Sequence, residues 1–199
     1  MDFNHVKSVY TFSCVFLCFI FLLPTLVVTL PPPGEEKFSE LWLLGSNHTI
    51  EGGSLNVSTA TPHTVYLGVA NHMNDLEYYR VYVKFRQQNE LLPDEAAELG
   101  SPLEPIFEYC LFLSNNETWE GEFKFSFEEI TFEENIAHVS KLSINGYEVN
   151  VDKTVIWDKE GMGFYCQFFY ELWIYNSTTL GFQYHNRYVS LWLKLTNTS

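Results

Sequence analysis

The chain has 199 residues and a formal net charge of −14 at pH 7, with 25 acidic against 11 basic side chains. A surface this acidic repels nucleic acid and anionic lipid headgroups, which excludes both as partners. The net charge belongs to residues 35–199, a stretch long enough to form one domain with a hydrophobic core of its own.

The first element in the chain is an apolar segment at residues 10–30, which carries no charged side chain. As a helix it would span roughly 31 Å, about the thickness of the hydrocarbon core of a bilayer. No small-residue cleavage site ends it, so residues 1–30 are predicted to remain as a membrane anchor, and a cleaved secretory signal is the alternative. Lys7 before the segment and Glu35 and Glu36 after it predict that the rest of the chain lies outside the cell.

A proline-rich spacer and an exported domain follow the leader. Residues 31–37 read PPPGEEK, in which the prolines hold the backbone extended. Residues 38–199 contain five Asn-x-Ser/Thr sequons, the acceptor sites of N-linked glycans, and an occupied sequon must lie at the surface. The sequons begin at Asn47, Asn56, Asn116, Asn176 and Asn197. These features predict a single-pass glycoprotein of the cell membrane that faces outward, or a secreted one if the leader is cleaved.

Two cysteines lie outside the leader, Cys110 and Cys166, each within an aromatic run. In an oxidising compartment they could form a disulfide. Such a bridge would stabilise the fold by roughly 4 kcal/mol, because it closes a long loop in the unfolded chain. Two free thiols that pack as small hydrophobic groups are the alternative.

Alternation of apolar and polar side chains with a period of two predicts β-strands through most of the exported part. In residues 78–87 the inward set is Tyr79, Val81, Val83 and Phe85, and the outward set includes Arg80, Lys84 and Arg86. The same alternation runs through residues 119–128, with Trp119, Phe123, Phe125 and Phe127 inward, and through 188–196. Residues 64–70 and 106–113 predict further strands, and Asn145-Gly146 predicts a hairpin turn within 141–151. Residues 164–175 are apolar on both faces, which predicts a central strand.

Seven to nine short strands with short connections predict an all-β fold for residues 38–199. The arrangement we expect is an antiparallel, two-sheet, immunoglobulin-like β-sandwich. Two stretches interrupt the pattern. Residues 88–105 form an acidic insert that contains proline, with one helical turn expected at 94–99. Residues 128–138 fit either an edge strand or a short helix.

Four motifs occur in an order that resembles a known family. They are VYLGVANHMNDLEYYRVYVKF (65–85), LSNNETWEGEFKF (113–125), FFYELWIYN (168–176) and YHNRYVSLWLKLT (184–196). This order is similar to the exported β-domain of an archaeal family of predicted membrane proteins, catalogued as domain of unknown function 1616, over about residues 38–196. The resemblance implies a β fold, membrane attachment and an archaeal cell-surface setting, and it implies no catalytic residues. Members of the family typically carry several membrane spans before the β-domain, whereas this chain carries one apolar segment.

The residue types that carry chemistry are scattered along the chain. The exported histidines, His48, His63, His72, His138 and His185, have none of the spacings of a metal site. The acidic clusters at 128–129 and 133–134 lack the ligand alternation of a calcium loop, and the chain has no nucleophile elbow or phosphate-binding glycine loop. We therefore expect no metal, no cofactor and no enzymatic activity.

Two functions fit these observations. The first is a non-catalytic structural or interaction subunit of the cell surface or of an envelope assembly, which contacts other surface proteins or copies of itself. It predicts an exposed strand edge or apolar patch that glycans leave uncovered. The second is a secreted or tethered carbohydrate-binding module, motivated by an aromatic content of 17%.

The candidate interaction patch combines residues from two strand regions. It consists of Tyr78, Tyr82, Tyr184, His185, Arg187, Tyr188 and Trp192. For His185 and Arg187, which stand beside tyrosines, a hydrogen-bonded structural corner is the alternative to a contact with a partner. Of the aromatic side chains, Tyr78, Tyr82 and Trp192 are the ones predicted to be exposed, because most phenylalanines and tryptophans fall on inward sets.

Overall fold

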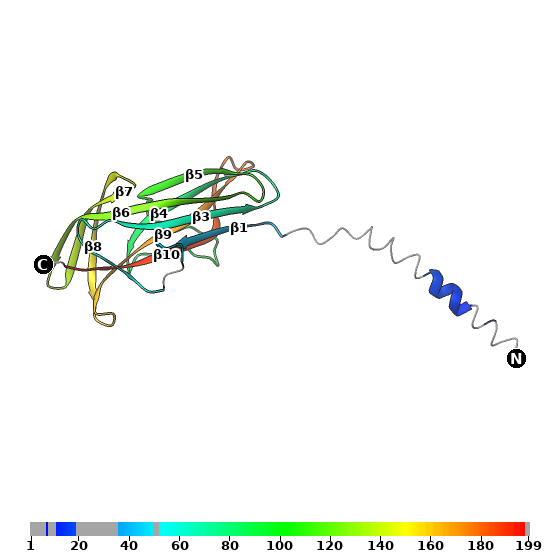
Figure 1. Cartoon of the computed structure of the whole chain (residues 1–199), viewed down its shortest axis with the longest axis horizontal. Helices are drawn as coiled ribbons and strands as arrows, with labels where there is room; N and C mark the ends of the chain where they lie inside the picture. Colours follow the sequence, from blue (N-terminus) through cyan, green and yellow to red (C-terminus); the bar gives the residue numbers. More distant parts are fainter. Residues whose placement is uncertain (1–6, 8–10, 19–35, 50–51, 198–199) are drawn as a thin grey trace. The chain divides into compact units, whose positions relative to one another are not determined.

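A computed structural model describes residues 7, 11–18, 36–49 and 52–197. The chain divides into two units, Met1–Glu36 and Lys37–Ser199 (Figure 1). In the first unit residues 11–18 are helical. Among the residues described, no helix is both long enough and apolar enough to cross a membrane. Most of the predicted leader at 10–30 and most of the spacer at 31–37 lie outside the described residues.

The second unit is built from β-strands, which confirms the all-β prediction. The strands are β1 (Phe38–Leu44), β2 (Leu55–Val57), β3 (His63–His72), β4 (Glu77–Gln87), β5 (Phe107–Leu113), β6 (Thr118–Glu133), β7 (Ile136–Ile144), β8 (Tyr147–Asp158), β9 (Gly163–Asn176) and β10 (Gly181–Leu195). Every strand predicted from alternation is present. The stretch at 128–138 is strand on both sides of a turn, because β6 continues to Glu133 and β7 begins at Ile136.

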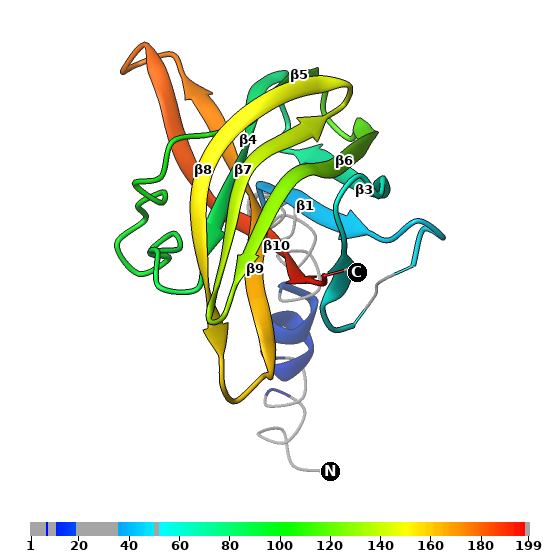
Figure 2. The same ribbon diagram turned by 90° about the vertical axis from the view of Figure 1, so that its left-hand side faces the viewer.

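The described strands form one curled ten-stranded sheet in the order β1-β3-β6-β7-β8-β9-β10-β2, with β4 pairing with β9 and β5 pairing with β4 (Figure 2). Neighbours are antiparallel, as predicted, except that β2 runs parallel to β10. The sequence predicted two separate sheets. They are joined here because β8 pairs with β7 along most of its length and with β9 through Trp157 and Asp158.

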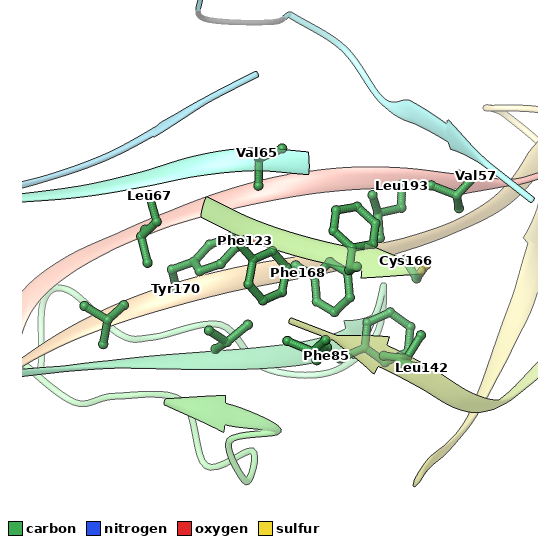
Figure 3. Packing of buried hydrophobic residues seen from close by; sticks show 14 of the residues in the cluster. Val57, Val65, Leu67, Phe85, Phe123, Leu142, Cys166, Phe168, Tyr170 and Leu193 are labelled. Carbon is green, nitrogen blue, oxygen red and sulfur yellow. The ribbon is translucent and has the colours of Figure 1, made fainter. Parts of the chain in front are cut away.

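The core lies between the facing sides of this sheet and is dominated by aromatic rings. Phe168 of β9 lies 5.5 Å from Phe123 of β6 and 5.2 Å from Phe85 of β4, measured between ring centroids (Figure 3). The predicted inward set of β4 is buried, from Tyr79 at 0% exposed to Phe85 at 2%. Phe123, Phe125 and Phe127 are buried as well, and Trp119 is half-buried. Strand β9 is buried on both faces, which confirms its prediction as a central strand.

Two local predictions have different outcomes. The hairpin turn at Asn145-Gly146 is present, and both residues have the positive φ that this turn needs, 49° and 86°. The helical turn predicted at 94–99 is wrong. Instead, the backbones of Asp94 and Leu99 exchange two hydrogen bonds, and the Asp94 carboxylate accepts from the amides of Ala96 and Ala97. Aspartate at the start of a turn favours this local bonding over a helix.

Of the two alternatives that the sequence left open for Cys110 and Cys166, the structure has the free thiols and not the disulfide. Strand register gives the reason: Cys110 pairs with Arg80 of β4, and Cys166 pairs with Gln87 of the same strand. Those β4 residues are seven positions apart (87 − 80), roughly 23 Å at about 3.3 Å per residue, far beyond the reach of a disulfide. Cys110 is exposed, whereas Cys166 is buried, and burial raises the pKa of its thiol.

Candidate functional site

The side chains of β4 that point away from the core share one face of the sheet with their neighbours on β5, β9 and β10. We call this surface the outer face. It follows from the register, which places Arg80 of β4 beside Cys110 of β5 and Trp173 of β9, and Trp173 beside Tyr184 of β10. Strands alternate their side chains, so every second residue on β4, β5 and β9 belongs to the outer face, and β10 follows the same rule on either side of an irregularity between Tyr184 and Tyr188.

A cluster of aromatic rings occupies one end of the outer face. The ring of Tyr78 stacks on Phe112 at 4.1 Å and meets the edge of Phe182 at 4.9 Å, and Tyr175 lies 5.4 Å from Phe182. The guanidinium of Arg80 lies 4.3 Å from the centroid of the Phe182 ring, a cation–π contact. Phe112 is 65% exposed. We call these five residues the aromatic patch.

The aromatic patch borders an open strand edge. Among the strands described, β5 pairs with β4 alone, so its other side offers unpaired backbone groups. Such an edge is a template for pairing with another chain unless it is short, charged or covered. On the outer face, β5 carries Phe112, Cys110 and Glu108, of which only Glu108 is charged. A carboxylate oxygen of Glu108 lies 3.8 Å from the guanidinium of Arg80.

The middle of the outer face holds a buried ion pair beneath the segment 88–106. The ammonium of Lys84 lies 2.9 Å from the Glu171 carboxylate, and the two side chains are 4% and 0% exposed. Glu171 also accepts from the amide of Ser101 at 2.7 Å and from the indole N–H of Trp173 at 2.9 Å. Lys84 donates to the carbonyl of Ser101 at 2.7 Å. The ion pair therefore fastens segment 88–106 to the sheet.

Because of this covering segment, two residues of the predicted outward set of β4 are buried. Lys84 and Arg86 do point away from the core as predicted, yet they are 3% and 6% exposed. Arg86 donates to the side chain of Gln167 and to the carbonyl of Gln88, the first residue of the covering segment. These contacts satisfy charges that are costly to bury, so we assign the middle of the outer face a structural role.

His185 belongs to a hydrogen-bonded corner, the alternative that the sequence left open. Its Nε2 lies 3.0 Å from the hydroxyl of Ser39 on β1, and that hydroxyl lies 2.7 Å from the hydroxyl of Tyr79. Tyr79 in turn donates to the Oδ1 of Asn71 at 3.1 Å. His185 directly follows Tyr184, an outer-face residue, so alternation along β10 points its side chain to the other side of the strand, where it meets Ser39 of β1.

This corner predicts a loss of stability in acid. Burial, assisted by the charge of Arg187, lowers the pKa of His185, and burial lowers the pKa of His63. Both imidazoles therefore bind protons less readily in the fold than in the unfolded chain, which takes them up below a pH of about 6.5. Stability is therefore complete above that pH and falls as the pH drops.

The variant His185→Gln keeps a hydrogen-bond donor but does not titrate. Urea unfolding of this variant between pH 7 and pH 5 should show a shallower loss of unfolding free energy than the parent chain, and His63 contributes to the slope that remains. The same slope in both proteins would contradict the assignment.

The structure divides the predicted interaction patch into separate places. Tyr78 lies in the aromatic patch, and Tyr82 and Tyr184 flank Trp173 at 5.4 Å and 6.0 Å. Tyr188 is half-buried beyond the irregularity in β10. Arg187 is exposed and donates to the carbonyl of Asn186, and Trp192 lies toward the opposite end of the outer face. Phe112, Tyr175 and Phe182, which complete the aromatic patch, were not among the predicted exposed residues.

The sequon asparagines lie outside the aromatic patch. Asn47, Asn56, Asn116 and Asn197 are exposed, and Asn176 is half-buried at the end of β9. Asn116 lies within the turn at 114–117, and Asn176 comes directly before the turn at 177–180, so both fall at turns as predicted. Asn116 contacts His72 of β3 at 3.0 Å, and the amide of Asn176 donates to Gln183 at 3.0 Å.

The fold and the outer face define an all-β domain with a cluster of half-buried aromatic rings from which Phe112 is exposed. No family model and no curated protein matches the chain. Among solved structures it is similar to a β-glucosidase from Listeria innocua in complex with glucose, with a TM-score of 0.41 and 7% identity over 81% of this chain and 16% of the enzyme. For the complex with gluconolactone the TM-score is 0.38, with 12% identity over 84% of this chain and 18% of the enzyme. The chain thus spans less than a fifth of these enzymes, and we take neither fold nor activity from them.

Proposed function

We propose that this chain is a non-catalytic, membrane-tethered glycoprotein that acts as an interaction subunit of the archaeal cell surface or of an envelope assembly. The apolar segment at 10–30 serves as the tether, and the resemblance to an archaeal membrane-protein family supports the setting. The β-domain then works as immunoglobulin-like sandwiches do, as a rigid scaffold that presents one face to another envelope protein or to a second copy.

The observation that carries the proposal is the aromatic patch beside the open edge of β5. Tyrosine, phenylalanine and arginine are the residues enriched at the centres of protein interfaces. Phe112, the most exposed ring of the patch, is 65% exposed although it lies in a strand. The rings already pack on one another and on Arg80, so they lose little conformational entropy when a partner binds.

The positions of the sequons support the same surface. Asn176 follows Tyr175 on β9, so its side chain points to the opposite face of the sheet, where it contacts Gln183. Asn116 lies in the turn after β5, and its side chain is within hydrogen-bond distance of His72 on β3. Glycans at these sites would leave the aromatic patch open, as the hypothesis of an interaction subunit requires.

A photo-reactive phenylalanine analogue at position 112, introduced into the full chain in its native membrane, tests the proposal. We expect membranes to retain the chain in high salt and release it in detergent. Illumination should link position 112 to an envelope protein or to a second copy. Replacing both Tyr78 and Phe182 with serine should remove most of the product, because losing an interface centre weakens association roughly thirty-fold.

The matched control is the same analogue at Tyr147, which is 69% exposed at the β7–β8 hairpin. It should give little product, because it lies outside the patch. Equal yields at positions 112 and 147, or release of the chain by salt alone, would overturn the proposal.

A further inference from the structure

Two hollows meet at Trp192, toward the end of the outer face opposite the aromatic patch. One, of about 320 Å³, is lined by Tyr165, Asp158 and Gln88 among others, and the second, of about 390 Å³, extends to Leu44 of β1. Trp192 and Gly53 line both, so the two hollows adjoin at these residues. Each is at the low end of the range of small-ligand sites, about 300–1,000 Å³. We call this feature the Trp192 groove.

Two aromatic rings line the groove. Trp192 is 37% exposed on β10. The hydroxyl of Tyr165 donates to the carbonyl of Gly161 at 2.8 Å, and the ammonium of Lys194 lies 5.5 Å from the centroid of the same ring. These contacts fix the Tyr165 ring before any ligand arrives. Both rings therefore offer apolar faces beside the polar side chains of Asp158 and Gln88 in the first hollow, and the second hollow is lined largely by apolar side chains such as Leu44 and Val65.

A fixed carboxylate stands beside these rings. One oxygen of Asp158 accepts from the amide of Glu160 at 2.9 Å, and the other accepts from the side-chain amide of Gln88 at 3.3 Å. Hydrogen bonds from the Glu160 and Gly161 amides and from Gln88 lower the pKa of Asp158. At neutral pH this side chain is an oriented acceptor with lone pairs left for hydroxyl donors.

We propose that the Trp192 groove binds a neutral oligosaccharide. One sugar ring stacks on the indole of Trp192, because the weakly positive C–H groups of a pyranose face match the negative face of an aromatic ring. Its hydroxyls donate to Asp158 and exchange hydrogen bonds with Gln88. The following rings run past Ser190 toward Leu44 in the second hollow.

Charge selects a neutral ligand. The Asp158 carboxylate lines the groove, and the Lys194 ammonium beside Tyr165 offsets it locally, so the net charge of −14 on the whole chain is what disfavours carboxylated or sulfated glycans. A ligand that fits the groove needs an apolar ring face for Trp192 and hydroxyl donors for Asp158, and a sugar has both. This inference does not rest on the aromatic patch: variants of Phe112 and of Trp192 separate the two proposals.

Binding of neutral oligosaccharides of glucose, mannose, galactose and N-acetylglucosamine to the full chain tests the inference. The chain is produced without N-glycans and held in a detergent that contains no sugar, and titration calorimetry with tryptophan fluorescence measures the dissociation constant. At least one oligosaccharide should bind and quench tryptophan emission. Trp192→Ala should weaken this binding about tenfold or more, and Asp158→Asn should weaken it to a smaller extent.

Two further variants make the test decisive. Trp192→Tyr retains a ring and should keep most of the affinity even if Trp192→Ala perturbs the fold, while Phe112→Ala should bind as the parent chain does. Absence of binding to every neutral probe up to about 10 mM would overturn the inference. So would a preference for an anionic glycan or for an extended peptide, or unchanged affinity in Trp192→Ala.

Discussion

Replacing Lys84 with methionine is expected to lower the free energy of unfolding by about 3–5 kcal/mol. The methionine fills a similar volume but leaves the carboxylate of Glu171, which is 0% exposed, without its partner ammonium. The hydrogen bond from Lys84 to Ser101 is lost as well, which loosens segment 88–106. For a domain of this size the midpoint of thermal unfolding should fall by about 10 °C, measured by circular dichroism.

A double variant separates the cost of an unpaired charge from the worth of the pair. Lys84→Met with Glu171→Leu removes both charges and should recover a large part of the loss, because a buried ion pair often contributes little over apolar groups. The surface pair of Lys124 and Glu122 is the control. Lys124→Met should change the unfolding free energy by no more than about 0.5 kcal/mol. An effect at Lys84 as small as that at Lys124 would contradict the structural role.

The strands were predictable because each buries one side on the core. In β4 the inward residues Tyr79, Val81 and Val83 are all 0% exposed, and a sheet with one apolar side imposes a period of two on its sequence. The hairpin at Asn145-Gly146 was predictable for a different reason, since few residues adopt the backbone angles that it needs. Both signals are local, so one sequence is enough to reveal them.

The covering of the outer face was not predictable in the same way. Alternation separates the two faces of a strand, but it does not distinguish a face open to water from one covered by a distant segment. Ser101 and Glu171, which join the cover to the sheet, are far apart in the chain. One signal was available: residues 164–175 are apolar on both faces, and Glu171 lies in the middle of them, so that a cover and a partner charge were both required.

The register between strands, and which strands lie at the edges of the sheet, also could not be predicted from one sequence. The sequence placed Cys110 and Cys166 in strands but left open where along β4 each strand pairs, and that pairing keeps them apart. The exposure of Phe112 likewise depends on β5 lying at an edge of the sheet, a property of the topology. Tyr78 was assigned to the outward set because its own strand alternates clearly, and it is half-buried, because the rings that pack around it come from three other strands.

Truncating Phe168 to alanine should cost about 3–5 kcal/mol of unfolding free energy, because the cavity left behind cannot close fully. Phe168 is 0% exposed, and its ring contacts Phe125 at 5.0 Å and Phe123 at 5.5 Å across the core. It also lies 5.2 Å from Phe85. The midpoint of urea unfolding of the whole β-domain should fall, whereas the m-value, the slope of the unfolding free energy against urea concentration, should stay the same. The reason is that one core joins both halves of the curled sheet, so that they unfold together.

Phe112→Ala makes the same chemical change on the surface and serves as the matched control. Phe112 is 65% exposed, so its removal should shift the unfolding free energy by no more than about 0.5 kcal/mol. A loss for Phe168→Ala as small as that for Phe112→Ala would mean that the facing halves of the sheet do not share one core. If the two differ as expected, loss of a partner in variants of the aromatic patch reports on binding, because the fold tolerates the change.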